Sequence, residues 1–159
     1  MSGIAGSTAR WTRTPDPVDL PAPEPGLVIA FNYLWRREYD AGLEHGRYPR
    51  PCAIVVAYRR AADGARIVTV APITTREPGP DDAAVLIPAA VKRHLGLDAD
   101  QLSWVIVGEV NEFAWPGFDL EANARGEIAY GFVPRGLHAK IREGVLAAAR
   151  AQQLRRTPR

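Results

Sequence analysis

RPCAIVVA, residues 50–57, is a short apolar run, and VTVAPITT, residues 68–75, is a second one. Runs of this length that are rich in β-branched residues are typical of buried strands. Ala62-Asp63-Gly64 lies between them and contains a hairpin turn signal, so the two strands are expected to be neighbours. Arg50 opens the first strand and Thr74 ends the second. We therefore expect a guanidinium and a hydroxyl to lie close together, and a phosphate is the ligand group that suits this pair best.

The rest of the chain alternates short apolar runs with turn residues, and one long helical pattern follows near its end. Leu137, Ile141 and Val145 recur every four residues there, which predicts an apolar stripe that packs on the core. Hairpin-linked strands followed by one covering helix predict a mainly β domain with a C-terminal helix, arranged as a small antiparallel barrel. The expected strands are residues 27–33, 50–58, 66–73, 84–87, 103–110 and 128–133, and the expected helices are 88–94 and 134–152.

The barrel domain is expected to occupy residues 26–152. Residues 1–25 contain five prolines and few large apolar residues, which predicts a disordered, Pro-rich tail. Residues 153–159 include three arginines and are predicted to be a basic flexible tail. Residues 34–49 are predicted to be a long polar loop. Pro72 predicts an edge position or a bulge in its strand, because proline cannot donate to the ladder.

The composition is that of an ordinary globular domain, with 159 residues and 47% hydrophobic content. A net charge of +2 is too small to indicate nucleic-acid binding by itself. Of the 20 basic residues, however, 18 are arginine, which binds phosphate with a planar fork; a GC-rich genome explains the same bias. The single Cys52 excludes an internal disulfide. No apolar run of transmembrane length and no secretory signal are recognisable, so we expect a cytoplasmic protein without membrane contact.

Several well-known catalytic patterns are missing from the sequence. It has no phosphate loop of the G-x-x-x-x-G-K-[ST] type, no G-x-G-x-x-G fingerprint and no G-x-S-x-G elbow. His45, His94 and His138 have no partners at metal-ligand spacing, and the acidic residues are scattered. We therefore expect no metal and no other cofactor.

The order of segments resembles the MazF/PemK toxins of type II toxin–antitoxin systems, over roughly residues 25 to 150. The segments that match are a Gly-led first strand, an Arg-Pro pair that enters an apolar strand, an Ala-Pro-Ile-Thr strand, a late Ser-to-Glu strand and a closing helix. They correspond to Gly26-Leu27-Val28-Ile29, Arg50-Pro51, Val70-Ala71-Pro72-Ile73-Thr74, residues 103–110 and residues 134–152.

The resemblance implies an SH3-like barrel that forms a homodimer and acts as a growth-inhibiting, metal-independent endoribonuclease on single-stranded RNA. It also implies a cognate antitoxin that occupies the RNA groove. In the family, the matching arginine and threonine form the cleavage site, which corresponds to Arg50 and Thr74 here. Glu44 is the nearest candidate for the acidic residue of the preceding loop. Ser103 and Glu109 correspond to positions near the RNA groove.

The chemistry of the residue types is consistent with this reaction. In metal-free RNA cleavage the ribose 2′-hydroxyl attacks the adjacent phosphorus, and a fixed arginine stabilises the charge that develops. Neither arginine nor threonine is a good base, so Glu44 or His45 is expected to supply one. Aromatic residues interleaved with arginines in the loop can stack on bases. The residues expected to bind RNA are Trp35, Arg36, Arg37, Arg47, Tyr48, Thr75, Arg76, Ser103 and Glu109.

Two departures from the family pattern support an alternative. Leu27 follows the strand-opening glycine where an acidic residue is usual, and the loop at 34–49 lacks the common Gly-Ser-Glu-Gln run. The alternative is a barrel that binds nucleic acid, RNA or DNA, or a peptide, and has lost cleavage activity. A purely structural or partner-binding barrel is a third interpretation.

Overall fold

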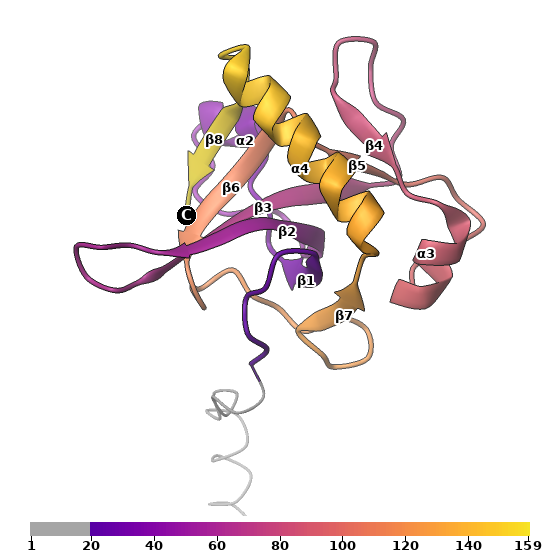
Figure 1. The fold of residues 1–159 in the computed structure, drawn as a ribbon, viewed down its shortest axis with the longest axis horizontal. Helices are drawn as coiled ribbons and strands as arrows, with labels where there is room; N and C mark the ends of the chain where they lie inside the picture. The colour runs from indigo at the N-terminus through magenta and orange to yellow at the C-terminus, as the bar shows by residue number, and fades with distance from the viewer. Residues whose placement is uncertain (1–19) are drawn as a thin grey trace, which may run out of the picture.

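The computed structural model describes residues 20–159, and within them the chain forms a mainly β fold with a C-terminal helix (Figure 1). The predicted tail at 1–25 therefore lies outside the described residues except for 20–25. The strands are β1 (Leu27–Phe31), β2 (Arg50–Arg59), β3 (Arg66–Thr74), β4 (Ala84–Leu86), β5 (Trp104–Ile106), β6 (Glu109–Ala114), β7 (Ala129–Phe132) and β8 (Arg155–Pro158). The helices are α2 (Arg36–Asp40), α3 (Ala89–Leu95) and α4 (Arg135–Arg150).

The strands form a single sheet with the order β4-β5-β3-β2-β1-β7, and β6 pairs with both β3 and β8. All pairings are antiparallel except that of β6 with β8, which is parallel. The terminal strands β4 and β7 do not pair with each other, so the sheet is open. The prediction of a mainly β fold with a C-terminal helix is confirmed, whereas the sheet does not close into the predicted barrel.

Both faces of the sheet are buried under apolar side chains. On one face, α4 lies across the sheet (Figure 1) and contributes Leu137, Ile141 and Val145 to a core that also includes Val28 of β1. The apolar stripe predicted for this helix is thus confirmed. The neighbouring Ile29 belongs to a second core on the opposite face, as expected because successive side chains of a strand alternate between the two faces. The second core also includes Leu27, Phe31, Tyr33, Trp35, Cys52, Ile54, Val68, Val70 and Phe113.

Two elements differ from the sequence prediction. The predicted loop at 34–49 contains the short helix α2, at whose start the backbone N–H of Trp35 donates to Glu38 Oε1 over 3.2 Å. The predicted strand at 103–110 is divided into β5, which pairs with β4, and β6, which pairs with β3. A continuous apolar run in the sequence does not indicate where a strand ends and its pairing partner changes.

The predicted flexible tail at 153–159 is wrong, because residues Arg155–Pro158 form strand β8 along β6. Thr157 is completely buried, and the guanidinium of Arg159 forms two hydrogen bonds of 3.2 Å with the carboxylate of Asp119. The folded unit therefore extends past residue 152.

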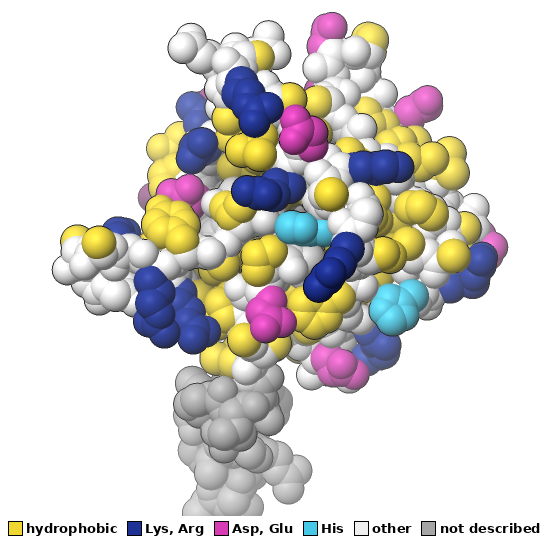
Figure 2. All heavy atoms as spheres, in the orientation of Figure 1, with side chains coloured by type: hydrophobic (Ala, Val, Ile, Leu, Met, Phe, Trp, Pro, Cys, Tyr) yellow, Lys and Arg dark blue, Asp and Glu magenta, His cyan; other side chains and the backbone are white. Residues whose placement is uncertain are grey.

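The face of the molecule that bears α4 carries dispersed charge. Figure 2 shows the face that bears α4, where Lys and Arg side chains stand singly or in small groups among apolar and acidic ones. Among the described residues, no helix has the length and apolar character needed to cross a membrane.

Candidate functional site

The candidate site arises where β2 and β3 separate. Cys52 lies opposite Pro72 at the end of their ladder, and the same register continued by two residues would place Arg50 opposite Thr74. Pro72 has no N–H with which to continue the ladder. Thr74 pairs with Trp104 of β5 on the other side of β3, and Arg50 pairs with Phe31 of β1 on the other side of β2.

The prediction that Pro72 marks an edge position or a bulge in its strand is wrong. Strand β3 is not at an edge, because it pairs with β2 on one side and with β6 and then β5 on the other. The irregularity in the β2–β3 register lies in β2 between Ile54 and Val56. Pro72 falls between the β6-paired and β5-paired parts of β3, where the strand changes partner.

The separation of the two strands leaves a cleft of about 820 Å³, which we call the main cleft. Arg50 and Thr74 both line it, as the sequence analysis expected of their positions. Seven further residues expected to bind RNA also line it, namely Trp35, Arg37, Tyr48, Thr75, Arg76, Ser103 and Glu109. Its lining also includes acidic residues that the sequence analysis did not single out, namely Glu77, Asp82 and Asp98.

Arg50 is held by aromatic rings. Its guanidinium carbon lies 5.0 Å from the centre of the Trp35 ring and 5.5 Å from that of Tyr48. Arg37 approaches the same indole ring to 4.7 Å. Within residues 20–159, Arg50 makes no ion pair, and its Nε is buried without an acceptor. The surface salt bridge that would explain Arg50 structurally is therefore not formed, and the site retains a positive group with an unused donor.

Thr74 is held by a local hydrogen bond. Its Oγ1 accepts from the backbone N–H of Arg76 over 3.1 Å. Because the oxygen acts as acceptor in this contact, the hydroxyl proton is free to be donated to a ligand. Thr74 thus offers a neutral donor in the same cleft as the Arg50 guanidinium.

Glu109 is a carboxylate of the main cleft whose pKa is raised. Its Oε1 accepts from the hydroxyl of Tyr33 and from the backbone N–H of Arg36, both over 3.0 Å. Burial raises the pKa of Glu109 above its ordinary value, although these two donors and the charges of Arg37 and Arg155 act in the opposite direction. Burial, and secondly the charge of Glu109, raise the pKa of Tyr33. The second oxygen, Oε2, has no protein donor in the part of the chain that the structure describes.

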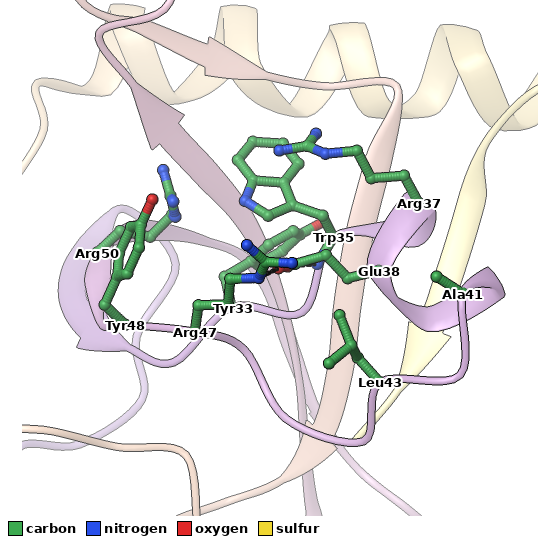
Figure 3. Close-up of a pocket in the computed structure, with 9 residues that line it drawn as sticks. All are labelled: Tyr33, Trp35, Arg37, Glu38, Ala41, Leu43, Arg47, Tyr48 and Arg50. Carbon is green, nitrogen blue, oxygen red and sulfur yellow. Dashed lines mark hydrogen bonds and ion pairs between the residues drawn. The ribbon is translucent and has the colours of Figure 1, made fainter.

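A smaller cavity of about 340 Å³, which we call the side pocket, adjoins the main cleft (Figure 3). Trp35, Arg37, Tyr48 and Arg50 line both cavities, so they form a shared wall. The side pocket is completed by Tyr33, Glu38, Ala41, Leu43 and Arg47.

Three of the predicted site residues line neither cavity, and a fourth, Arg47, lines only the side pocket. Glu44 and His45 are exposed and line neither cavity; Nδ1 of His45 lies 3.5 Å from Nη2 of Arg159. The side chain of Arg36 turns toward Asp40, and only its backbone N–H contacts Glu109. The structure thus brings Arg50 and Thr74 together with Glu109, and not with the two expected bases.

No sequence signal marks Glu109 as the residue with the perturbed carboxylate. Its burial depends on Tyr33 and Arg36, which are more than 70 residues away in the chain. Among residues 20–159, no group of three or more His, Cys, Asp or Glu is arranged to hold a metal ion.

Comparisons with known proteins do not assign the chain to a family. No protein-family model matches it, and no curated protein matches it. Proposals about its function therefore depend on the residues of the two cavities and on the resemblance described above.

Proposed function

We propose that this protein is a metal-independent endoribonuclease that cleaves single-stranded RNA, and that it acts as the growth-inhibiting toxin of a type II toxin–antitoxin system. The observation that supports the proposal is the presence of Arg50 and Thr74 in one cleft, with Arg50 free of any ion pair within the described residues. An unneutralised guanidinium and a free hydroxyl proton are suited to two oxygens of one phosphate.

In the proposed reaction, the ribose 2′-oxygen forms a bond to the adjacent phosphorus, and the bond from phosphorus to the 5′-oxygen of the next nucleotide breaks. The products are a 2′,3′-cyclic phosphate and a 5′-hydroxyl. Arg50 stabilises the extra negative charge on the phosphorus oxygens in the transition state, and loss of one such donor typically costs about 10²–10³ in rate. Thr74 donates to a second oxygen and orients the phosphate.

Glu109 is the base in this proposal. It lines the main cleft with Arg50 and Thr74, and its Oε2 is free to take the proton of the 2′-hydroxyl. Burial raises its pKa, which makes the carboxylate a stronger proton acceptor than an exposed glutamate. The leaving 5′-oxygen takes a proton from water. Glu44 and His45, which line neither cavity, have no part in it.

The resemblance adds three features to the proposal. The open sheet with its C-terminal helix is taken as a variant of the SH3-like barrel of MazF/PemK toxins. The active form is a homodimer, and a cognate antitoxin segment covers the RNA groove. These features are tested separately, by the mass of the protein in solution and by co-purification with the product of a neighbouring gene.

The central test is incubation of the purified protein with single-stranded RNA in the presence of EDTA. We expect products that end in a 2′,3′-cyclic phosphate, and we expect Arg50→Ala to lower the rate by about 10²–10³. Arg142→Ala is the matched control, because Arg142 is exposed on α4 and lines neither cavity. Absence of cleavage, or equal rates for wild type and Arg50→Ala, would contradict the nuclease proposal. RNA or DNA binding without scission, weakened by salt, would support the non-catalytic alternative instead.

A further inference from the structure

The side pocket has the composition of a site for a flat, polar ligand. Its volume of about 340 Å³ lies in the range of small-ligand sites, which is about 300–1,000 Å³. Tyr33 and Trp35 contribute buried aromatic surface, and Tyr48, which also lines the pocket, is 63% exposed. A nucleobase can stack on an exposed aromatic ring of this kind.

The shared wall connects this pocket to the phosphate position. Trp35 Nε1 and Arg50 Nε are both buried and without acceptors, and both belong to residues that line the two cavities. The positive guanidinium of Arg50 on this wall suits an anionic oxygen. A nucleotide whose phosphate lies against this wall has its base within reach of the side pocket.

The side pocket offers both a carboxylate acceptor and guanidinium donors. Glu38 is nearly buried, with 11% of its side chain exposed, and its Oε2 lies 3.4 Å from Nε of Arg47. The two terminal nitrogens of Arg47 have no partner in residues 20–159. Figure 3 shows Arg47 crossing in front of Tyr33 and reaching Glu38, and its side chain is 71% exposed at the mouth of the pocket. The pocket therefore presents a carboxylate acceptor next to an arginine fork.

This combination matches guanine. Arginine forms a bidentate contact with guanine O6 and N7, and a carboxylate accepts from the N1–H and N2–H groups of the same base. Adenine and cytosine each place an amino donor where guanine has O6, and uracil has no amino group. We propose that the side pocket binds the guanine base of the nucleotide whose phosphate lies in the main cleft. The position of that phosphate rests on the proposed function.

The test is binding of a pentanucleotide of uridines whose central base is guanine, hypoxanthine or 7-deazaguanine. Every sugar carries a 2′-fluoro group, so that no strand can be cut and binding is measured apart from cleavage. Hypoxanthine lacks the N2 amino group that Glu38 would accept from, and 7-deazaguanine lacks the N7 that Arg47 would donate to. By fluorescence anisotropy we expect the guanine strand to bind about tenfold more tightly than either analogue.

A pair of variants identifies the carboxylate. Glu38→Gln keeps the shape of the side chain and an oxygen that accepts from the backbone N–H of Trp35. Because the variant lacks the carboxylate, we expect the ratio of guanine to hypoxanthine affinity to fall toward one. Glu127→Gln, an exposed residue outside both cavities, should leave the ratio unchanged. The strand series with wild-type protein decides the question even if Glu38→Gln fails to fold.

Equal affinities of wild type for the three strands would overturn the guanine site. This result is distinct from failure of the nuclease proposal, which is measured with unmodified RNA. A protein that prefers guanine but never cuts RNA supports the pocket and contradicts the nuclease. A protein that cuts RNA while binding the three strands equally supports the nuclease and contradicts the guanine pocket.

Discussion

The guanidinium of Arg50 lies 5.0 Å from the centre of the Trp35 indole ring, and within the described residues it has no carboxylate partner. An ion pair would hold this arginine and also neutralise it. An aromatic ring holds it by cation–π attraction, which leaves its full charge for a ligand. Orientation without neutralisation is the property that transition-state stabilisation of a phosphate requires.

Arg50→Lys tests whether the fork and the stacking matter beyond the charge. Lysine keeps the positive charge, but it lacks the planar fork and stacks less well on Trp35 and Tyr48. We expect RNA cleavage at saturating substrate to fall about 10- to 100-fold, which is less than the loss expected for Arg50→Ala. A lysine variant with the wild-type rate would show that only net charge matters at this position.

Substitutions of Thr74 separate its hydroxyl from its shape. Thr74→Val keeps the shape and removes the donor, and a lost hydrogen bond to a charged group costs about 1.5–3 kcal/mol, or roughly 10- to 150-fold in rate. Thr74→Ser keeps the hydroxyl and the acceptor for the Arg76 N–H, so we expect it to retain most of the activity. Single-turnover cleavage rates make the comparison. Equal rates for the two variants would remove Thr74 from the reaction.

Glu109→Gln is expected to change stability and activity in opposite directions. Burial raises the pKa of Glu109 in the folded protein, so ionisation of this group opposes folding. This loss of stability is absent when the pH is below the pKa of Glu109 in the unfolded chain, about 4.3. It grows as the pH rises and levels off once the pH exceeds the raised pKa of Glu109 in the folded protein. Glutamine carries no charge, so the variant should be more stable than wild type at pH 7 and equal to it at acid pH. Thermal unfolding at pH 7 measures this stabilisation as a rise in Tm of about 2–4 °C for each kcal/mol.

The same substitution tests the role of Glu109 as the base. Cleavage by the wild type should increase with pH up to the raised pKa, because only the ionised carboxylate accepts the proton. Glu109→Gln should remove this rise together with most of the rate. A variant that is stabilised but cleaves RNA with the wild-type pH profile would restrict Glu109 to a structural role.

The sequence was sufficient to predict elements that are specified locally. The hairpin of β2 and β3 follows from two β-branched runs around a turn signal, and the stripe of α4 follows from its period. What the sequence could not indicate depends on distant partners. Glu109 accepts a hydrogen bond from Tyr33, 76 residues away in the chain, and Arg159, just after strand β8, donates to Asp119, 40 residues away. Among the candidate site residues, the sequence order was enough to expect Arg50 and Thr74 in one place, but not which carboxylate would accompany them.

The ion pair between Arg159 and Asp119 is expected to hold strand β8 in place. Their side chains are only 8% and 12% exposed, and breaking a buried pair by removing one partner costs about 3–5 kcal/mol. We expect Asp119→Ala to lower the free energy of unfolding by about this amount. Glu143→Ala is the control, because its pair with Arg150 is exposed and is worth about 0–1 kcal/mol. Urea unfolding of both variants makes the comparison, and equal small losses would mean that β8 is held by other contacts.

Gly144 tests the contact of α4 with the sheet. Alanine is ordinarily favoured over glycine in a helix by about 1 kcal/mol. At this position, however, an added Cβ would lie 2.7 Å from Cγ2 of Val107, a fully buried core residue. Overpacking of this kind costs about 1–3 kcal/mol, so we expect Gly144→Ala to be destabilising in spite of its propensity.

Gly136 provides the matched control for that substitution. It lies in the same helix, and an added Cβ there would meet no atom within 4 Å. Gly136→Ala should therefore stabilise the protein by about 0.4–1 kcal/mol. Thermal unfolding of the two variants should shift Tm in opposite directions. A rise in Tm for both would mean that α4 is not packed closely against Val107, and the core between the helix and the sheet would then be looser than the structure indicates.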